Sequence, residues 1–179
     1  KTSSKKSINN IKYLGHMNDF NPSFALNYNK KSLNTRVSFS TNLNNNLILD
    51  HSYIQKKTGN KTYGIGALDR HWSFSDRSSL IMSSNSRPTK SIYFKFEDNK
   101  SSKLFERLSF DIFNGISKGV ENPNNSMLFG TRIVIAPAKK LELEFFKLSQ
   151  WGGDGYDSDP SVILKSFFGD TNDGKNANI

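Results

Sequence analysis

Apolar and polar residues alternate in seven separate segments of the sequence. Successive side chains of a β-strand point to opposite sides of the sheet, so this alternation places all apolar side chains of a segment on one face. In one segment, for example, Phe94 and Phe96 alternate with Lys95 and Glu97. The segments with this pattern are residues 23–29, 35–41, 63–68, 92–97, 107–112, 129–135 and 141–145. The sequence therefore predicts an all-β protein.

Short polar connections separate most of the predicted strands. Clusters of Asn, Lys, Ser, Gly and Pro are typical of turns between neighbouring antiparallel strands. These clusters are residues 29–32, 42–46, 58–60, 98–102 and 137–140, and the longer stretches without alternation are residues 73–88, 114–126 and 150–160. We predict an antiparallel up-and-down meander with at most one or two short helices. Residues 161–168 are the one helix candidate, although their Val-Ile-Leu run also suits a strand.

The polar faces of the predicted strands carry many charges, and two arrangements explain them. In a soluble sandwich or barrel the charges face water and the apolar faces form the core. In a membrane barrel the apolar faces contact lipid and the charges line a wet lumen. The membrane alternative predicts that Phe39, Phe94, Phe96, Phe110, Ile133 and Leu143 point outward. It predicts that Arg36, Lys95, Arg107, Arg132, Glu142 and Glu144 point inward.

The composition narrows the possible classes further. The 179 residues suffice for one domain, and 12% aromatic residues argue against disorder. The absence of cysteine excludes disulfides, thiol catalysis and cysteine-ligated metal clusters. The net charge of +9 suits anionic lipid, acidic polysaccharide or nucleic acid. However, the lysine pairs are scattered over predicted turns and no nucleic-acid-binding motif is present, so we expect no nucleic-acid partner.

Two blocks of the sequence contain distinctive motifs. The first block consists of residues 49–54 (LDHSYI), 64–72 (GIGALDRHW) and 79–88 (SLIMSSNSRP). The second consists of residues 129–132 (FGTR), 141–144 (LELE), 150–155 (QWGGDG) and 168–170 (FGD). In order and spacing, these motifs resemble the capsule assembly protein Wzi family of bacterial outer-membrane β-barrels. The resemblance covers approximately residues 18–174.

This resemblance implies a fold and a location. The strands would be transmembrane strands of an outer-membrane barrel in a Gram-negative bacterium. Because family members are much longer, we expect an internal fragment, in which residues 1–179 form a single partial β-barrel domain with both ends truncated.

The resemblance also implies a function without catalysis. The barrel would bind or anchor exported capsular polysaccharide or exopolysaccharide at the cell surface, in a lectin-like manner. Its partners would be this polysaccharide and outer-membrane lipid, and we expect no cofactor and no metal. Two alternatives remain open: a porin-like outer-membrane channel for small solutes, and a soluble, secreted carbohydrate-binding β-sandwich.

Eleven residues in the motif blocks are candidates for polysaccharide contact or for a polar network in the lumen. They are Arg70, His71, Trp72, Asn85, Arg87, Arg132, Glu142, Glu144, Gln150, Trp151 and Asp154. Structural explanations compete with these roles. The two tryptophans suit an aromatic girdle at the membrane interface as well as a platform for sugar rings, and Asn85 suits a turn that Pro88 stiffens.

The charged candidates also have more than one explanation. We predict that Arg87 and Arg132 point into the barrel and pair with inward carboxylates, because a guanidinium that leaves water needs acceptors. Glu142 and Glu144 have the spacing of a glycosidase pair, but neighbouring charges in a lumen explain them better. Residues 152–155 lack the Lys of a phosphate-binding loop and predict a tight turn, and the acidic residues that follow suit a solvated loop better than a cation site.

Overall fold

The computed structural model describes residues 23–41, 47–73, 82, 88–99, 104–116 and 124–168. Within these residues, nine strands form one sheet in the order β1-β2-β4-β5-β6-β7-β8-β9, with β3 beside β2. All neighbouring strands are antiparallel. The elements are β1 (Ser23–Lys30), β2 (Leu33–Thr41), β3 (Leu47–Ile48), β4 (Tyr53–Thr58), β5 (Lys61–Ala67), β6 (Lys90–Asp98), β7 (Arg107–Ile116), β8 (Met127–Ala138), β9 (Leu141–Trp151) and the helix α1 (Ser161–Phe167).

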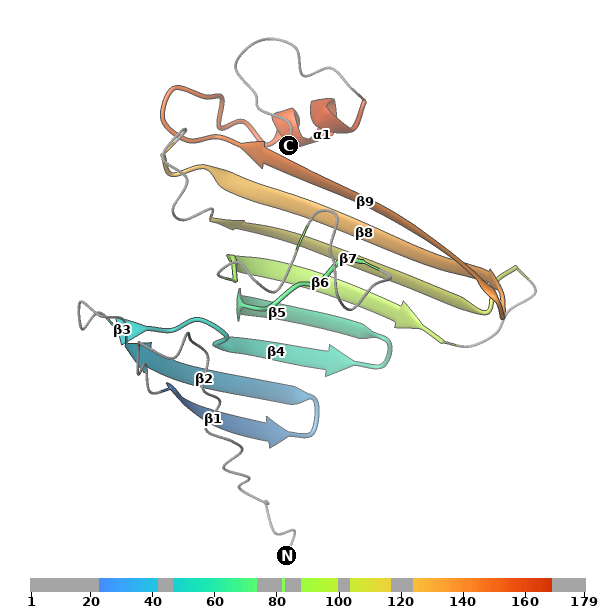
Figure 1. The fold of residues 1–179 in the computed structure, drawn as a ribbon, viewed down its shortest axis with the longest axis horizontal. Coiled ribbons are helices and arrows are strands. Elements are labelled where there is room, and N and C mark those ends of the chain that lie inside the picture. Colours follow the sequence, from blue (N-terminus) through green and yellow to red (C-terminus); the bar gives the residue numbers. More distant parts are fainter. Residues whose placement is uncertain are drawn as a thin grey trace, which may run out of the picture.

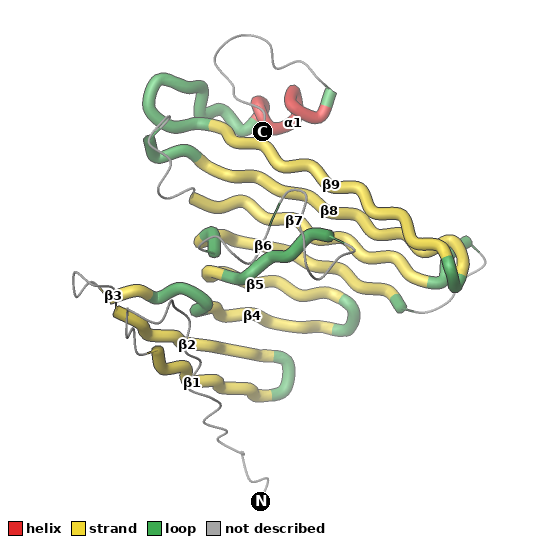
Figure 2. The backbone as a smooth tube through the Cα atoms, viewed as in Figure 1, coloured by secondary structure: helices red, strands yellow, loops and turns green. Residues whose placement is uncertain are grey.

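The observed architecture confirms the predicted all-β meander with a short helix. The described chain is mostly strand, and β1 and β9 form the two edges of the sheet (Figures 1 and 2). Two strands, β3 and β4, lie outside the seven segments that the alternation predicted. In β4 the run Gln55-Lys56-Lys57 hides the alternation, and the strand forms because its main chain pairs with β2 and β5. Across the described residues, no helix is both long and apolar enough to cross a membrane.

The two ends of the sheet differ in the length of their connections. At one end, two-residue turns join β1 to β2, β4 to β5 and β8 to β9, and an eight-residue connection joins β6 to β7. Gly59 in the second of these turns has a φ of 59°, in the left-handed region that glycine adopts without a steric cost. At the other end lie the long connections from β2 to β4, from β5 to β6 and from β7 to β8. We call these the short-turn end and the long-loop end.

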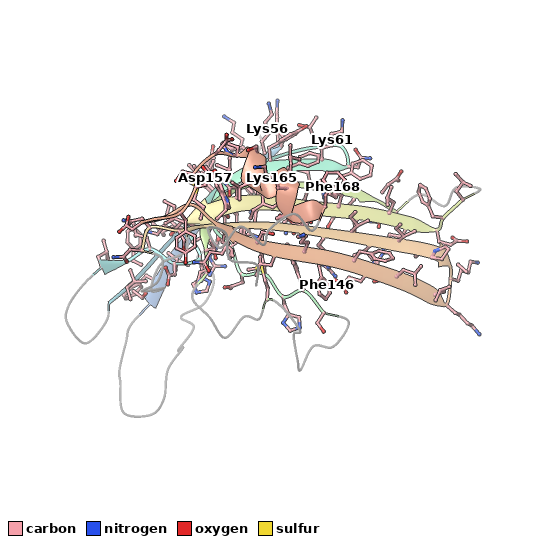
Figure 3. All side chains as sticks on the ribbon, turned by 90° about the horizontal axis from the view of Figure 1, so that it is seen from above. Lys56, Lys61, Phe146, Asp157, Lys165 and Phe168 are labelled. Carbon is pink, nitrogen blue, oxygen red and sulfur yellow. The ribbon has the colours of Figure 1, made fainter. Side chains whose placement is uncertain are left out.

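The sheet is curved, and its register puts the predicted apolar rows on one face and the predicted charged rows on the other, although Lys61 at the short-turn end also lies on the apolar face. Figure 3 shows Lys61 on the convex side and Phe146 on the concave side. Lys61 pairs with Phe96, so the row of apolar residues that contains Phe96 and Phe110 shares the convex, outer face. Phe146 pairs with Arg132, which places the charged row on the concave, inner face. The same alternation puts all six predicted outward residues outside and all six predicted charges inside.

A small core lies on the inner face. It consists of Trp72, Tyr93, Phe113 and Leu148, with partly buried side chains packed around it. Trp72 and Phe113 are each 1% exposed, and their ring centroids lie 5.5 Å apart in an edge-on arrangement. Phe113 fits because its neighbour across the strands is Gly130. A Cβ atom at position 130 would lie 2.3 Å from Cε1 of Phe113, so only glycine leaves room for this ring.

We predict that Gly130→Ala destabilises the protein. The added methyl group overlaps the Phe113 ring, and overpacking of this kind costs about 1–3 kcal/mol. The measurement is the free energy of unfolding by urea. Gly59→Asn is the matched control, because that turn has open space and asparagine tolerates the left-handed region. Equal stability of the Gly130→Ala and the unaltered protein would contradict this account of the core.

Candidate functional site

Among the described residues, three ion pairs lie on the inner face of the sheet between β6 and β9. Nζ of Lys95 lies 3.2 Å from Oδ2 of Asp111 on the neighbouring strand. Nε of Arg132 donates to Oε1 of Glu144, and an Nη2 hydrogen of Arg107 is donated to Oε2 of Glu142. The predicted pairing of Arg132 with an inward carboxylate is therefore present. Each glutamate thus faces its own arginine, and the ion pairs account for the inward position of Glu142 and Glu144.

These pairs differ in how far they are removed from water. The side chain of Glu144 is fully buried and that of Arg132 is 26% exposed, whereas Arg107 and Glu142 are 44% and 31% exposed. Two buried carboxylate oxygens, Oε2 of Glu144 and Oδ1 of Asp111, have no hydrogen-bond partner within the described structure. Buried acceptors of this kind normally find a donor. The inner face therefore has spare capacity to accept hydrogen bonds from water or from hydroxyl groups.

Arg70 is buried above this charged row, after the end of β5. Its Nη2 donates to Oγ of Ser91 at 2.8 Å, and its guanidinium carbon lies 4.0 Å from the centroid of the Phe113 ring. The residue is 4% exposed. Burial lowers the pKa of Arg70, and Asp111 opposes this effect through its negative charge. The guanidinium thus stacks on an aromatic ring in the way that favours arginine over lysine.

Trp72 ties the same segment to the inner face. Its backbone N–H donates to the carbonyl of Met82 at 3.1 Å, and its ring belongs to the inner core. His71 between them is half-buried. The segment from Leu68 to Trp72 therefore covers the inner side of the sheet. An indole that is 1% exposed offers no free ring face, so the core position accounts for Trp72 better than a sugar platform does.

Trp151 lies on the opposite side of the sheet. Its register partner is Met127, which follows the outer-face alternation of β8. The indole Nε1 donates to Oδ1 of Asn114 at 3.0 Å, and the residue is 6% exposed. The two tryptophans therefore do not form one binding platform, although both were candidates from sequence.

The remaining candidates lie at the long-loop end or outside the described residues. Gln150 is buried and donates to Oγ of Ser126 at 2.7 Å. The predicted tight turn follows, with positive φ angles at Gly152, Gly153 and Gly155. Asp154 donates its backbone N–H to the carbonyl of Asn124 and leaves its side chain exposed. Asn85 and Arg87 lie outside the described residues.

The acidic loop before α1 is explained by local hydrogen bonds. Oδ1 of Asp159 accepts the backbone N–H of Ser161 at 2.8 Å, and this hydrogen bond lowers the pKa of Asp159. Oδ1 of Asp157 accepts the backbone N–H of Asp159 at 2.9 Å. In the part of the chain that the structure describes, no group of three or more His, Asp or Glu residues is placed to hold a metal ion.

Comparison with known proteins agrees with this geometry. The family model for the capsule assembly protein Wzi matches residues 4–178. The chain belongs to this family. A solved structure with a similar fold is described as Wzi, an outer membrane protein involved in group 1 capsule assembly in Escherichia coli and a carbohydrate-binding β-barrel. The two share 16% sequence identity at a TM-score of 0.72, over 79% of this chain and 34% of that one. The chain thus spans about a third of the solved structure, and no curated protein matches it.

Several residues that organise this Wzi-family sheet were not candidates from sequence. Ser91 holds Arg70, and Tyr93 donates its hydroxyl hydrogen to Oε1 of Gln55 at 3.0 Å. The Tyr93 ring lies over Gly64 on the next strand, as Phe113 lies over Gly130. In the sequence, the sign of such a residue was an aromatic side chain on the polar face of a predicted strand. The glycine that it packs on can be identified only when the register of the strands is known.

We predict that Arg132→Ala destabilises the sheet more than Arg107→Ala does. Removing Arg132 leaves the fully buried carboxylate of Glu144 without its ion-pair partner, which costs about 1–3 kcal/mol. Glu142 is partly exposed, so water replaces part of the lost interaction in Arg107→Ala. Urea unfolding of the two variants gives the comparison.

A double variant, Arg132→Ala with Glu144→Gln, serves as the control. The neutral amide introduced by Glu144→Gln replaces the buried charge of Glu144, so we expect the double variant to be more stable than Arg132→Ala alone. Equal losses in Arg132→Ala and Arg107→Ala would contradict the assigned difference in burial.

Proposed function

We propose that the chain is part of an outer-membrane β-barrel that binds or anchors exported capsular polysaccharide or exopolysaccharide at the cell surface, without catalysing a reaction. Family membership supports this function, and so does the fold shared with a carbohydrate-binding outer-membrane barrel. The observation that carries the proposal is the pair of contrasting faces, one apolar and uncovered, the other charged and paired. We further propose that residues 1–179 form one partial barrel domain.

The outer face is suited to lipid. Large apolar side chains remain uncovered there, with Phe24 62% exposed, Ile92 60% and Phe145 57%. A soluble β-sandwich buries such a face against a second sheet. The described strands form one sheet, so they supply no such cover. A membrane supplies it, while the charged inner face lines a polar interior.

The connections give the sheet an orientation in this membrane. Outer-membrane barrels have short turns on the periplasmic side and longer loops outside the cell. The short-turn end therefore faces the periplasm, and the long-loop end faces the capsule. Residues 68–73 belong to the long-loop end and fold back over the inner face, where Arg70 and Trp72 are held. This packing favours an anchor over an open channel.

We predict that the full-length protein shows no steady pore conductance in a planar lipid bilayer. The segment that carries Trp72 fills space on the inner face. Trp72→Ala removes the side chain that holds this segment there, so we expect the variant to show conducting events more often than the unaltered protein. A stable conductance of porin size in the unaltered protein would support the porin-like alternative instead.

We also predict that the candidate loop residues affect polysaccharide retention. Replacing both Asn85 and Arg87 with alanine removes polar groups from the longest connection at the long-loop end and lowers the amount of polysaccharide retained on washed cells. Asn99→Ala, at an exposed position of the short-turn end, is the control.

Retention is compared at equal amounts of protein in the outer membrane. If cells that lack the protein entirely retain as much polysaccharide as unaltered cells, the proposed function is wrong. If cells that lack the protein retain less polysaccharide but cells with the double variant retain a normal amount, Asn85 and Arg87 are not the contact site.

A further inference from the structure

The outer face is interrupted by polar residues next to the edge of the sheet. Along β8 and β9, the outward positions Ile133 and Phe145 are followed toward the long-loop end by Thr131 and Lys147, which are register partners, and then by Ser149. Lipid accepts such side chains poorly, most of all the charged lysine. Ser149 is nevertheless 1% exposed and Thr131 9% exposed, so other protein atoms cover them.

The helix α1 provides cover at this point. It lies beside β9 at the edge of the sheet (Figure 1), and Figure 3 places its residue Lys165 on the outer side. Nζ of Lys147 donates to the backbone carbonyl of Ser166, and the hydroxyl groups of Ser149 and Ser166 lie 3.1 Å apart. Lys147 and Ser149 of the outer face are thus hydrogen-bonded to the helix, which replaces part of their contact with water.

The opposite side of α1 is apolar and uncovered. Val162 and Ser166, one helical turn apart, are 2% and 3% exposed. Leu164 and Phe168, the residue that caps the C-terminal end of the helix, are also four residues apart, and they are 64% and 87% exposed. Lys165 lies beside them and is exposed. Apolar side chains next to a cation are typical of a short helix at the boundary between lipid headgroups and acyl chains.

We propose that α1 is a lipid-contacting helix that completes the membrane-facing surface of the sheet next to β9. Leu164 and Phe168 replace the lipid-facing side chains that the polar patch of Thr131, Lys147 and Ser149 lacks. Lys165 extends its ammonium group to lipid phosphate, as long basic side chains do at membrane interfaces. The helix then lies in the leaflet at the long-loop end. This inference rests on the proposed membrane location of the sheet.

Site-directed fluorescence tests the proposal. The sequence has no cysteine, so a single introduced cysteine can be labelled selectively with an environment-sensitive dye. Phe168→Cys and, separately, Leu164→Cys report on α1 in the full-length protein reconstituted into lipid vesicles. Phe145→Cys on the outer face of β9 is the lipid-facing control, and Asp154→Cys in the exposed loop is the water-facing control. Each label is exposed in turn to lipids brominated on the acyl chain and to aqueous iodide.

We expect brominated lipid to quench the labels at positions 164 and 168 to nearly the same fraction as the label at position 145, with a matching blue shift of their emission. Iodide should quench only the label at position 154. If brominated lipid quenches position 145 but neither helix position, α1 does not contact lipid and the inference is overturned, whether water or protein surrounds the helix. If position 145 also escapes quenching, the proposed membrane location itself is wrong.

Discussion

The packing of aromatic rings over glycines on the inner face supports most of the other features. Phe113 lies over Gly130 and Tyr93 lies over Gly64, so two rings lie close to the sheet on neighbouring strands. Their upper surfaces then receive Arg70 and Trp72, which come from the connection after β5. A side chain at either glycine position would push the ring away from the sheet, and the connection that carries Arg70 and Trp72 could then not pack against it.

The two faces of the sheet impose opposite requirements on their surroundings. The outer face is apolar and needs a low-dielectric environment, whereas the inner face has ion pairs whose carboxylates still have unused acceptor capacity. Neither face is satisfied by water alone or by lipid alone. A sheet that separates a lipid phase from a polar interior meets both requirements, which is why the proposed barrel fits the physical chemistry as well as the family.

The sequence predicted the strands where the alternation was regular, and it predicted the faces correctly once the membrane alternative was considered. It missed β4, where lysines occupy consecutive positions, because main-chain pairing rather than side-chain pattern forms that strand. It identified Arg132 and Glu144 as inward residues but gave no sign of the stacking of Arg70 on Phe113. Arg70 lies in the connection after β5 and Phe113 lies in β7, and a local sequence pattern does not show a contact between residues so far apart in the chain.

The position of Trp72 has a consequence for the order of assembly. The indole is held against the inner face, and its connection is tied to β5 at one side and to β6 at the other. Its partners Phe113 and Leu148 come from β7 and β9, which follow it in the chain. The indole is therefore fully buried only after these strands have joined the sheet. A connection that begins and ends at the rim can then close over the inner face without breaking any strand pair, so we expect this segment to become ordered after the sheet it covers.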